Sequence, residues 1–281
     1  MSKKLLALYG LKRNPFAPDC PTEDLYVSNF VRHFISRVEQ MSRSGGFATL
    51  TGDCGLGKSS ILRITEARLC TQHDLGLAVL SCPQARMTDF YRELGDRYGV
   101  KLNPSNRWGG TKVLRQSWHS QRDQLGFQPV LLVDEAQEMR LEVLCELRLL
   151  CTTELDARPL LTVVLCGDNR LVDRLKLPEL RPLQSRLRVR LHLEPVSREE
   201  LLACLKHTLS QAGAPTLMTE ELQAALCDHA AGNYRTLMTQ ADELLTAAVQ
   251  CEAPRLDEKL FFEVFSPNPA PTRQKSAAVR R

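Results

Sequence analysis

The stretch TLTGDCGLGKSS, which begins at Thr49, constrains the fold of this chain more than any other feature. Its letters complete the pattern GxxxxGK(S/T), in which a glycine-rich turn joins a strand to a helix. Backbone N–H groups of such a turn converge on phosphates, and the N-terminus of the following helix adds partial positive charge. The lysine meets the β- and γ-phosphates, and the first serine hydroxyl binds Mg²⁺. The predicted nucleotide-binding residues are Gly52, Asp53, Cys54, Gly55, Leu56, Gly57, Lys58, Ser59 and Ser60.

Apolar strands alternate with amphipathic helices as far as Pro195. Continuous apolar runs are typical of parallel strands that are buried on both faces, so an α/β fold with a five-stranded parallel sheet is predicted. The predicted strands span residues 47–51, 76–82, 129–135, 160–167 and 188–195. The predicted helices between them span residues 59–70, 87–98, 111–125 and 141–151.

After Pro195 the strands stop and only helical patterns follow. Two of these begin at Ser197 and Thr219, with acidic residues in the first turn, as helix starts do. The predicted helices of this part span residues 197–213, 219–232, 233–250 and 257–265. The predicted organisation is an N-terminal segment and first helix packed on the core (1–46), a nucleotide-binding core (47–195), a small helical lid (196–265) and a disordered basic tail (266–281).

Charge distribution and cysteine usage indicate where nucleic acid could bind and in which compartment the protein acts. The net charge of +4 equals the charge of the tail, which holds four basic residues and no acid, so a nucleic-acid surface requires local clustering. The ten cysteines are scattered, and Cys145, Cys166, Cys204 and Cys227 fall in apolar patterns. We therefore expect reduced thiols and a cytoplasmic protein. The apolar runs are too short to cross a bilayer, and no signal peptide is predicted.

A second motif, LLVDEAQEM, places two carboxylates at the end of a predicted strand. Asp134 can bind Mg²⁺ directly or through water. Glu135 can polarise a water molecule for attack on the γ-phosphate. Two adjacent carboxylates at a strand end are costly to desolvate without a cation, which supports a shared site with the phosphate loop.

These motifs, an extra strand–helix unit between them and the helical lid resemble the AAA+ ATPases. The resemblance implies ATP and Mg²⁺ as cofactors and predicts a γ-phosphate sensor at Asp168 or Asn169. It also implies that Arg235, in AGNYRTL, reaches the nucleotide. In PLQSRLRVR it implies an arginine finger, best matched by Arg186 and next by Arg181, that acts on the neighbouring subunit of an oligomer.

Four segments, LYGLKRNPFAPD, DEAQ, GDNRL and GNYRTLM, are similar to the bacterial ATPases related to the secretion-pathway A component and to transposition helpers such as the phage Mu B protein. Since no hydrophobic segment follows the ATPase, the helper group is favoured. This resemblance implies head-to-tail assembly on duplex DNA and recruitment of a transposase, with hydrolysis driving disassembly. The alternative is an envelope-assembly ATPase without DNA binding; a replication-initiator or helicase-loader relative is a third possibility.

Residues 97–122 carry six basic residues and no acid. In related assemblies this region faces DNA, so Lys112 and Arg115, which share a helix face, and their neighbours Arg107 and Trp108 are predicted DNA contacts. The alternative interpretation is a solvated helix face with Trp118 in the core.

Overall fold

The computed structural model describes residues 8–80, 83–102, 107–153 and 158–265. They form two compact units. One unit is Val27–Glu194, and the other combines the described residues up to Tyr26 with those from Pro195 onward.

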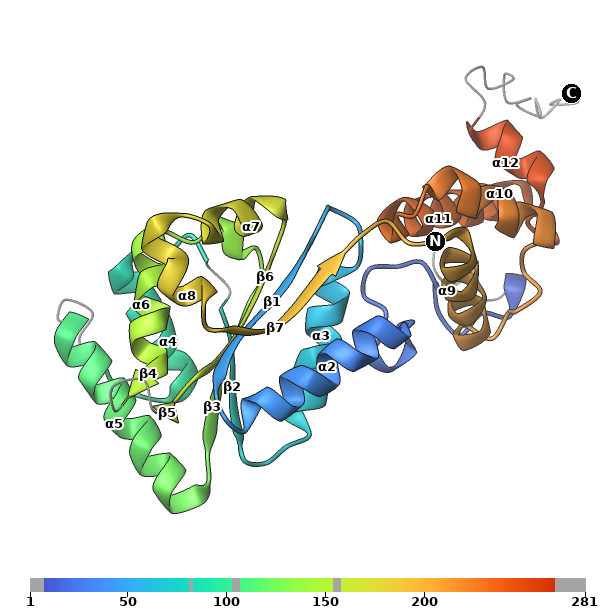
Figure 1. Cartoon of the computed structure of the whole chain (residues 1–281). Helices are drawn as coiled ribbons and strands as arrows, with labels where there is room; N and C mark the ends of the chain where they lie inside the picture. Colours follow the sequence, from blue (N-terminus) through green and yellow to red (C-terminus); the bar gives the residue numbers. More distant parts are fainter. Residues whose placement is uncertain (1–7, 81–82, 103–106, 154–157, 266–281) are drawn as a thin grey trace, which may run out of the picture. The chain divides into compact units, whose positions relative to one another are not determined.

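The larger unit is built on a five-stranded sheet in which every paired strand is parallel (Figure 1). The order β2-β3-β6-β1-β7 places β6 between the strand of the phosphate loop and the strand of the second motif. The predicted fold class is therefore confirmed, and the carboxyl ends of all five strands meet at one edge. The strands are β1 (Gly46–Gly52), β2 (Leu75–Leu80), β3 (Gln128–Val133), β6 (Thr162–Gly167) and β7 (Leu187–Leu193).

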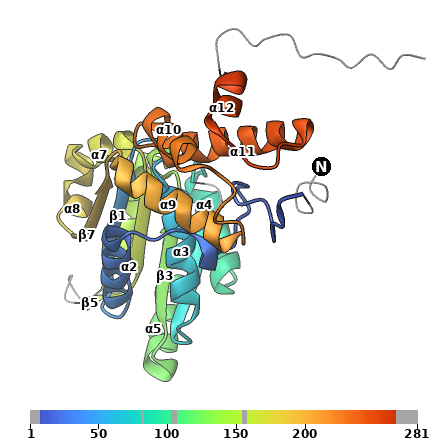
Figure 2. The same ribbon diagram turned by 90° about the vertical axis from the view of Figure 1, so that its right-hand side faces the viewer.

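Helices cover both faces of this sheet, as its continuous apolar strands require. Ala48 and Leu50 of β1 pack with α2 and α3, whereas Phe47 belongs to the core on the other face. Figures 1 and 2 show α2 and α3 side by side on one face. That face holds α2 (Asn29–Ser42) and α3 (Lys58–Cys70). The other holds α4 (Met87–Tyr98), α5 (Arg107–Leu125), α6 (Leu141–Cys151), α7 (Asn169–Leu175) and α8 (Arg181–Gln184).

The shortest elements are those that the sequence pattern does not predict. These are α7, α8 and an antiparallel pair formed by β4 (Thr152–Thr153) and β5 (Arg158–Pro159). Each is too short to show a hydrophobic period. In contrast, α4 and α6 have the predicted bounds, and α5 begins at Arg107 rather than Thr111.

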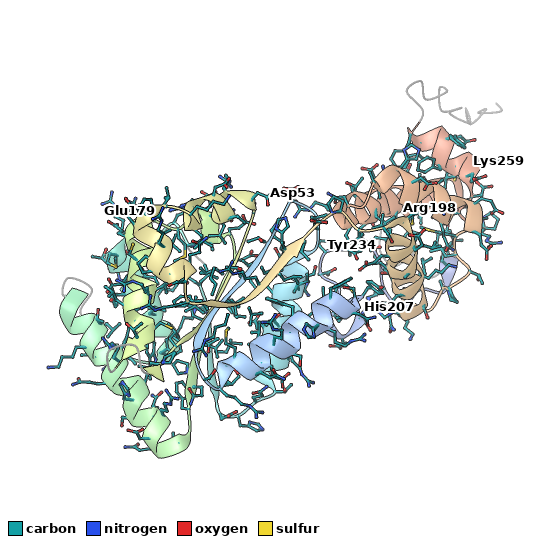
Figure 3. The ribbon with its side chains drawn as sticks, viewed as in Figure 1. Asp53, Glu179, Arg198, His207, Tyr234 and Lys259 are labelled. Atoms are coloured by element: carbon teal, nitrogen blue, oxygen red, sulfur yellow. The ribbon has the colours of Figure 1, made fainter. Side chains whose placement is uncertain are left out.

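The smaller unit is helical, as the lid prediction requires. Ser197, Thr219 and Asn233 cap three of its helices, each side chain accepting a hydrogen bond from a backbone N–H in the first turn. The Tyr234 hydroxyl donates to Glu200 at 3.1 Å (Figure 3 labels Tyr234). The helices are α9 (Arg198–Gln211), α10 (Glu220–Ala230), α11 (Tyr234–Cys251) and α12 (Glu258–Phe265).

The N-terminal segment differs from its prediction. The helix α2 packs on the ATPase core as expected, but the residues before Val27 belong to the helical unit. Leu11 and Phe16 are buried in the core of that unit. The Tyr9 hydroxyl donates to the Ala253 carbonyl at 2.8 Å. Assigning this whole segment to the ATPase core was wrong, because its apolar side chains are buried among the lid helices. The predicted tail, 266–281, lies outside the described residues.

The cysteines and the apolar helices can be compared with the expectations from composition. No disulfide joins the cysteines of the described ranges, and Cys166, Cys204 and Cys227 are buried as small apolar residues. Burial raises the pKa of Cys204 to about 12 and that of Cys227 to about 11. Among the helices of the described residues, none combines the length and the apolar character needed to span a bilayer.

Candidate functional site

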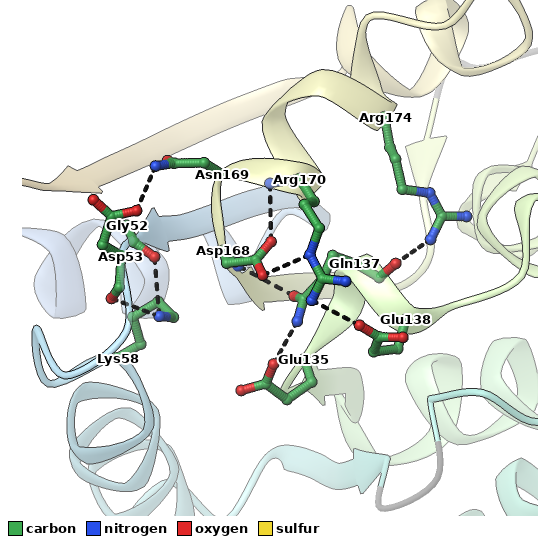
Figure 4. A network of polar contacts seen from close by, with 10 residues as sticks. All are labelled: Gly52, Asp53, Lys58, Glu135, Gln137, Glu138, Asp168, Asn169, Arg170 and Arg174. Atoms are coloured by element: carbon green, nitrogen blue, oxygen red, sulfur yellow. Dashed lines mark hydrogen bonds and ion pairs between the residues drawn. The ribbon is translucent and has the colours of Figure 1, made fainter.

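The phosphate loop lies between β1 and α3. Gly52 has φ 153°, and a Cβ there would lie 2.7 Å from the Leu193 carbonyl oxygen, so glycine lets the loop leave the sheet beside β7. Gly57, with φ 88°, turns the chain into α3. Lys58 is buried, and its Nζ donates to the carbonyls of Gly52 and Asp53, both at 2.9 Å (Figure 4). The lysine is thus turned inward onto its own loop.

The two carboxylates follow β3 at the same edge of the sheet. Asp134 Oδ1 accepts the Glu135 N–H at 2.9 Å, and Glu135 is one of the few non-glycine residues with a left-handed backbone, φ 51°. Such a conformation is uncommon outside glycine and concentrates at functional sites. Cys166 of β6 lies beside Asp134, and burial, followed by the Asp134 charge, raises the pKa of its thiol.

The predicted sensor residues after β6 face in different directions. Asp168 caps α7: its carboxylate accepts the Arg170 N–H at 2.9 Å and pairs with the Arg170 guanidinium at 2.8 Å. Asn169 instead donates to Asp53 Oδ1 at 2.6 Å, and so reaches the phosphate loop (Figure 4). Of the two alternatives, Asn169 is the one that contacts the phosphate loop, and the sensor role stays a prediction.

Sequence reasoning missed Gln137. This buried residue of the 3-10 turn Ala136–Glu138 donates from Nε2 to Glu135 and accepts the Asp168 N–H at Oε1, at 3.1 Å. Its signal was present in the DEAQ form of the second motif, but spacing within one motif does not predict a contact with the next strand.

Oxygen donors suit the predicted magnesium site. Ser59 is exposed at the start of α3, and Asp134 is half-buried at the end of β3. Mg²⁺ is held by one or two carboxylates together with substrate phosphates and water, rather than by an all-protein cage. The described residues contain no group of three or more His, Cys, Asp or Glu side chains that could hold a metal. Ser59 and Asp134 therefore fit Mg²⁺ carried by a nucleotide.

Arg186 lies at the opposite edge of the sheet. It immediately precedes β7, and its guanidinium donates to the Pro182 carbonyl. It lines a pocket of about 360 Å³ at the start of β1. The pocket is also lined by Gly46, Phe47, Cys151, Thr152, Pro159, Ser185 and Arg188. The structure does not bring Arg186 to the phosphate loop of its own chain. Arg181, the second choice, is exposed at the start of α8.

Arg235 is exposed at the second position of α11, in the helical unit. Its role toward the nucleotide stays a prediction.

The predicted DNA-binding residues on α5 have different surroundings in the structure. Lys112 is exposed, but the Arg115 guanidinium donates to the Thr152 carbonyl of the β4–β5 hairpin. Trp118 is fully buried against Tyr98, with ring centroids 5.1 Å apart, as the alternative interpretation expected. The side chains of Arg107 and Trp108 lie outside the described residues. Lys112 is thus exposed on this helix and Arg115 is held by the hairpin, and the DNA contacts stay predictions.

Comparisons with known proteins match the class of ATPase that the motifs resemble. Residues 41–175 match the AAA domain family. General secretion pathway protein A of Aeromonas hydrophila is 31% identical over 248 residues, which cover 85% of this chain and 44% of that protein. The chain thus spans less than half the length of this relative. The resemblance to the secretion-pathway A component is confirmed.

Solved structures share the fold at low sequence identity. Cdc6p from Pyrobaculum aerophilum is 16% identical with a TM-score of 0.64, over 86% of this chain and 67% of that chain. The Aeropyrum pernix ORC2 protein is 16% identical with a TM-score of 0.67, over 92% and 72%. The Aeropyrum pernix ORC1 protein in complex with DNA is 15% identical with a TM-score of 0.63, over 89% and 67%. At these identities the likeness shows the fold alone.

Proposed function

We propose, from the match of residues 41–175 to the AAA domain family, that this chain binds ATP with Mg²⁺ and hydrolyses it. The observation that carries the proposal is the meeting of three loops at the carboxyl edge of the sheet. The 2.6 Å hydrogen bond from Asn169 to Asp53 ties the sensor segment to the phosphate loop, while Glu135 stands at the end of β3.

Each residue has a chemical task in this reaction. Lys58 exchanges the carbonyls of its own loop for the β- and γ-phosphates, and backbone N–H groups of the loop bind the same anion. Ser59 and Asp134 hold Mg²⁺, which supplies charge neutralisation when bound. Glu135 accepts a hydrogen bond from the attacking water and orients it. Asn169 senses the γ-phosphate, and Arg235 contacts the nucleotide from the lid.

Arg186 is proposed to act in trans within a head-to-tail oligomer. An arginine at the amino edge of the sheet lies on the opposite side from its own phosphate loop, so a neighbouring subunit must present it. It would neutralise charge in the phosphoryl-transfer transition state.

Duplex DNA is the proposed effector, and a transposase the proposed partner, of a cytoplasmic assembly that forms with ATP and dissolves on hydrolysis. DNA binding is supported by exposed Lys112 on the basic segment and by the fold shared with an ORC1 protein solved in complex with DNA. Recruitment of a transposase rests on the motif resemblance alone.

A second candidate function has specific support. The identity of 31% to general secretion pathway protein A favours an ATPase that assists an envelope complex and does not bind DNA. The two candidates share the nucleotide site and differ in the effector.

One experiment tests both levels of the proposal. ATP turnover of the wild-type chain is measured with and without nonspecific duplex DNA, alongside ATP-dependent mobility shift of that DNA. Lys58→Ala should lose ATP binding, and Glu135→Gln should bind ATP, retain DNA and not hydrolyse. Turnover by Glu135→Gln at the wild-type rate would refute the catalytic assignment. If DNA does not change the turnover and its mobility does not shift, DNA is excluded as the effector. The envelope-assembly ATPase then remains as the candidate function.

A further inference from the structure

A single buried amide connects the water-orienting carboxylate to the sensor segment. Gln137 is 4% exposed and follows Glu135 within one tight turn. Its Nε2 donates to Glu135 Oε2, and its Oε1 accepts the backbone N–H of Asp168 at 3.1 Å (Figure 4). Both ends of the carboxamide are therefore used, one by β3's turn and the other by the segment after β6.

The chemistry of this bridge requires an amide. A carboxylate needs a donor and a backbone N–H needs an acceptor, and among side chains of this length only glutamine offers both on one planar group. If the amide were reversed, its NH₂ group would face the Asp168 N–H and its oxygen would face the Glu135 carboxylate. The two partners therefore define the orientation of the amide. Glutamate in place of Gln137 would keep the acceptor for Asp168 and repel Glu135.

Packing holds the amide in this place. A Cβ on Gly167 would lie 2.5 Å from Gln137 Oε1, so the last residue of β6 has no side chain because the amide occupies that space. The φ of Gly167 is not in the left-handed region. A larger residue at this position is therefore disfavoured by contact with Gln137 and Leu171 rather than by backbone strain.

Further contacts join the two loops. Arg170 pairs with Glu138 at 2.8 Å and with Asp168 at 2.8 Å, and the Arg174 guanidinium donates to the Gln137 carbonyl. Because Asn169 of the same segment reaches the phosphate loop, a continuous chain of hydrogen bonds leads from that loop through the segment to Gln137.

We propose that Gln137 is a positioning residue that sets the orientation of Glu135 and couples it to the γ-phosphate sensor segment. The amide engages one oxygen of the Glu135 carboxylate and aims the other at the attacking water. This inference rests on the proposed ATP hydrolysis, and it adds a residue whose effect is exerted through Glu135 and not through nucleotide affinity.

The first test separates orientation from binding. Gln137→Ala and Gln137→Glu should each lower kcat by about 10- to 100-fold, as a misplaced base does, while the Kd for ATP changes by less than about threefold. The near-isosteric Gln137→Glu is the sharper variant, because it keeps the Asp168 contact and replaces the donor to Glu135 with a like charge. In a Glu135→Gln background, which binds ATP without hydrolysing it, Gln137→Ala should leave the Kd for ATP unchanged, since its effect passes through the missing carboxylate.

The second test disturbs the amide without changing it. Gly167→Ala should displace Gln137 and lower kcat in the wild-type chain, yet cost much less in the Gln137→Ala background, where the colliding amide is gone. Wild-type kcat in both Gln137→Glu and Gly167→Ala would overturn this inference while leaving ATP hydrolysis intact. A wild-type chain that does not hydrolyse ATP would overturn the proposed function and this inference together. If Gln137→Ala fails to fold, the other two variants decide.

Discussion

Mixing two inactive variants tests whether Arg186 completes the site of a neighbouring subunit. The parallel pairing of β1 with β7 places Leu187 opposite Phe47 and Leu193 opposite Gly52. Six residue steps along β7 at about 3.3 Å each separate the two ends by roughly 20 Å, which a single side chain does not span. Arg186 therefore cannot reach the phosphate loop that follows Gly52 in its own chain.

The expected magnitudes follow from this separation. Arg186→Ala should bind ATP like the wild-type chain but lose turnover by about 1,000-fold or more. Glu135→Gln binds ATP and assembles but lacks the water-orienting group. In a mixture, a functional interface forms where an Arg186→Ala subunit with its intact Glu135 meets the intact arginine of a Glu135→Gln subunit. Random head-to-tail assembly of equal amounts gives such interfaces at about one in four, so turnover should recover to about a quarter of the wild-type rate.

The assay is steady-state ATP hydrolysis at constant total protein while the mole fraction of the two variants is varied. Turnover should be near zero at both ends and greatest at equal amounts. Light scattering on the same samples verifies that each variant, and the mixture, assembles with ATP. Assembled mixtures that stay inactive at every ratio would show that Arg186 does not act across the interface.

The remaining predictions concern the loop, the basic helix and the thiols. Asp53→Asn should tighten ATP binding about fivefold at low salt, because a charge about 4 Å from a phosphate costs about 1 kcal/mol in water; fluorescent-nucleotide titration measures this, and unchanged or weaker binding contradicts it. Lys112→Ala should weaken binding to all duplex sequences and reduce the slope of log affinity against log salt by about 0.9. Arg115→Ala should in addition lower the unfolding midpoint, because its guanidinium donates to the β4–β5 hairpin; unchanged affinity and slope in both variants would exclude this surface. At pH 8 a thiol reagent should label exposed Cys54, with ATP protecting it, and spare buried Cys204, whose pKa is raised to about 12 so that the reactive thiolate is absent; rapid labelling of Cys204 in the folded chain contradicts this.

Local sequence patterns predicted most of the fold. The strand and helix periods of the α/β unit predicted its five parallel strands, and the bounds of α4 and α6 agree with the pattern. The phosphate loop and the Asp134–Glu135 pair could also be predicted from the sequence, because the chemistry of each motif depends on residues that are adjacent in the sequence. Where elements are too short for a hydrophobic period to repeat several times, as in α7, α8 and the β4–β5 hairpin, the pattern predicted nothing.

Contacts between distant segments were decided by the tertiary structure alone. Asp168 and Asn169 are neighbours in sequence, yet one caps a helix and the other reaches Asp53, because the turn after β6 sends consecutive side chains in different directions. Gln137 meets Asp168 because β6 lies beside β3 in the sheet, a strand order that no spacing within either motif encodes. The N-terminal segment packs with helices more than 170 residues away, since Leu11 and Phe16 are buried only in that core. The sequence specifies which groups can act; strand order and packing determine which of them meet, because a contact between distant residues forms only where the folded backbone brings them within hydrogen-bonding distance.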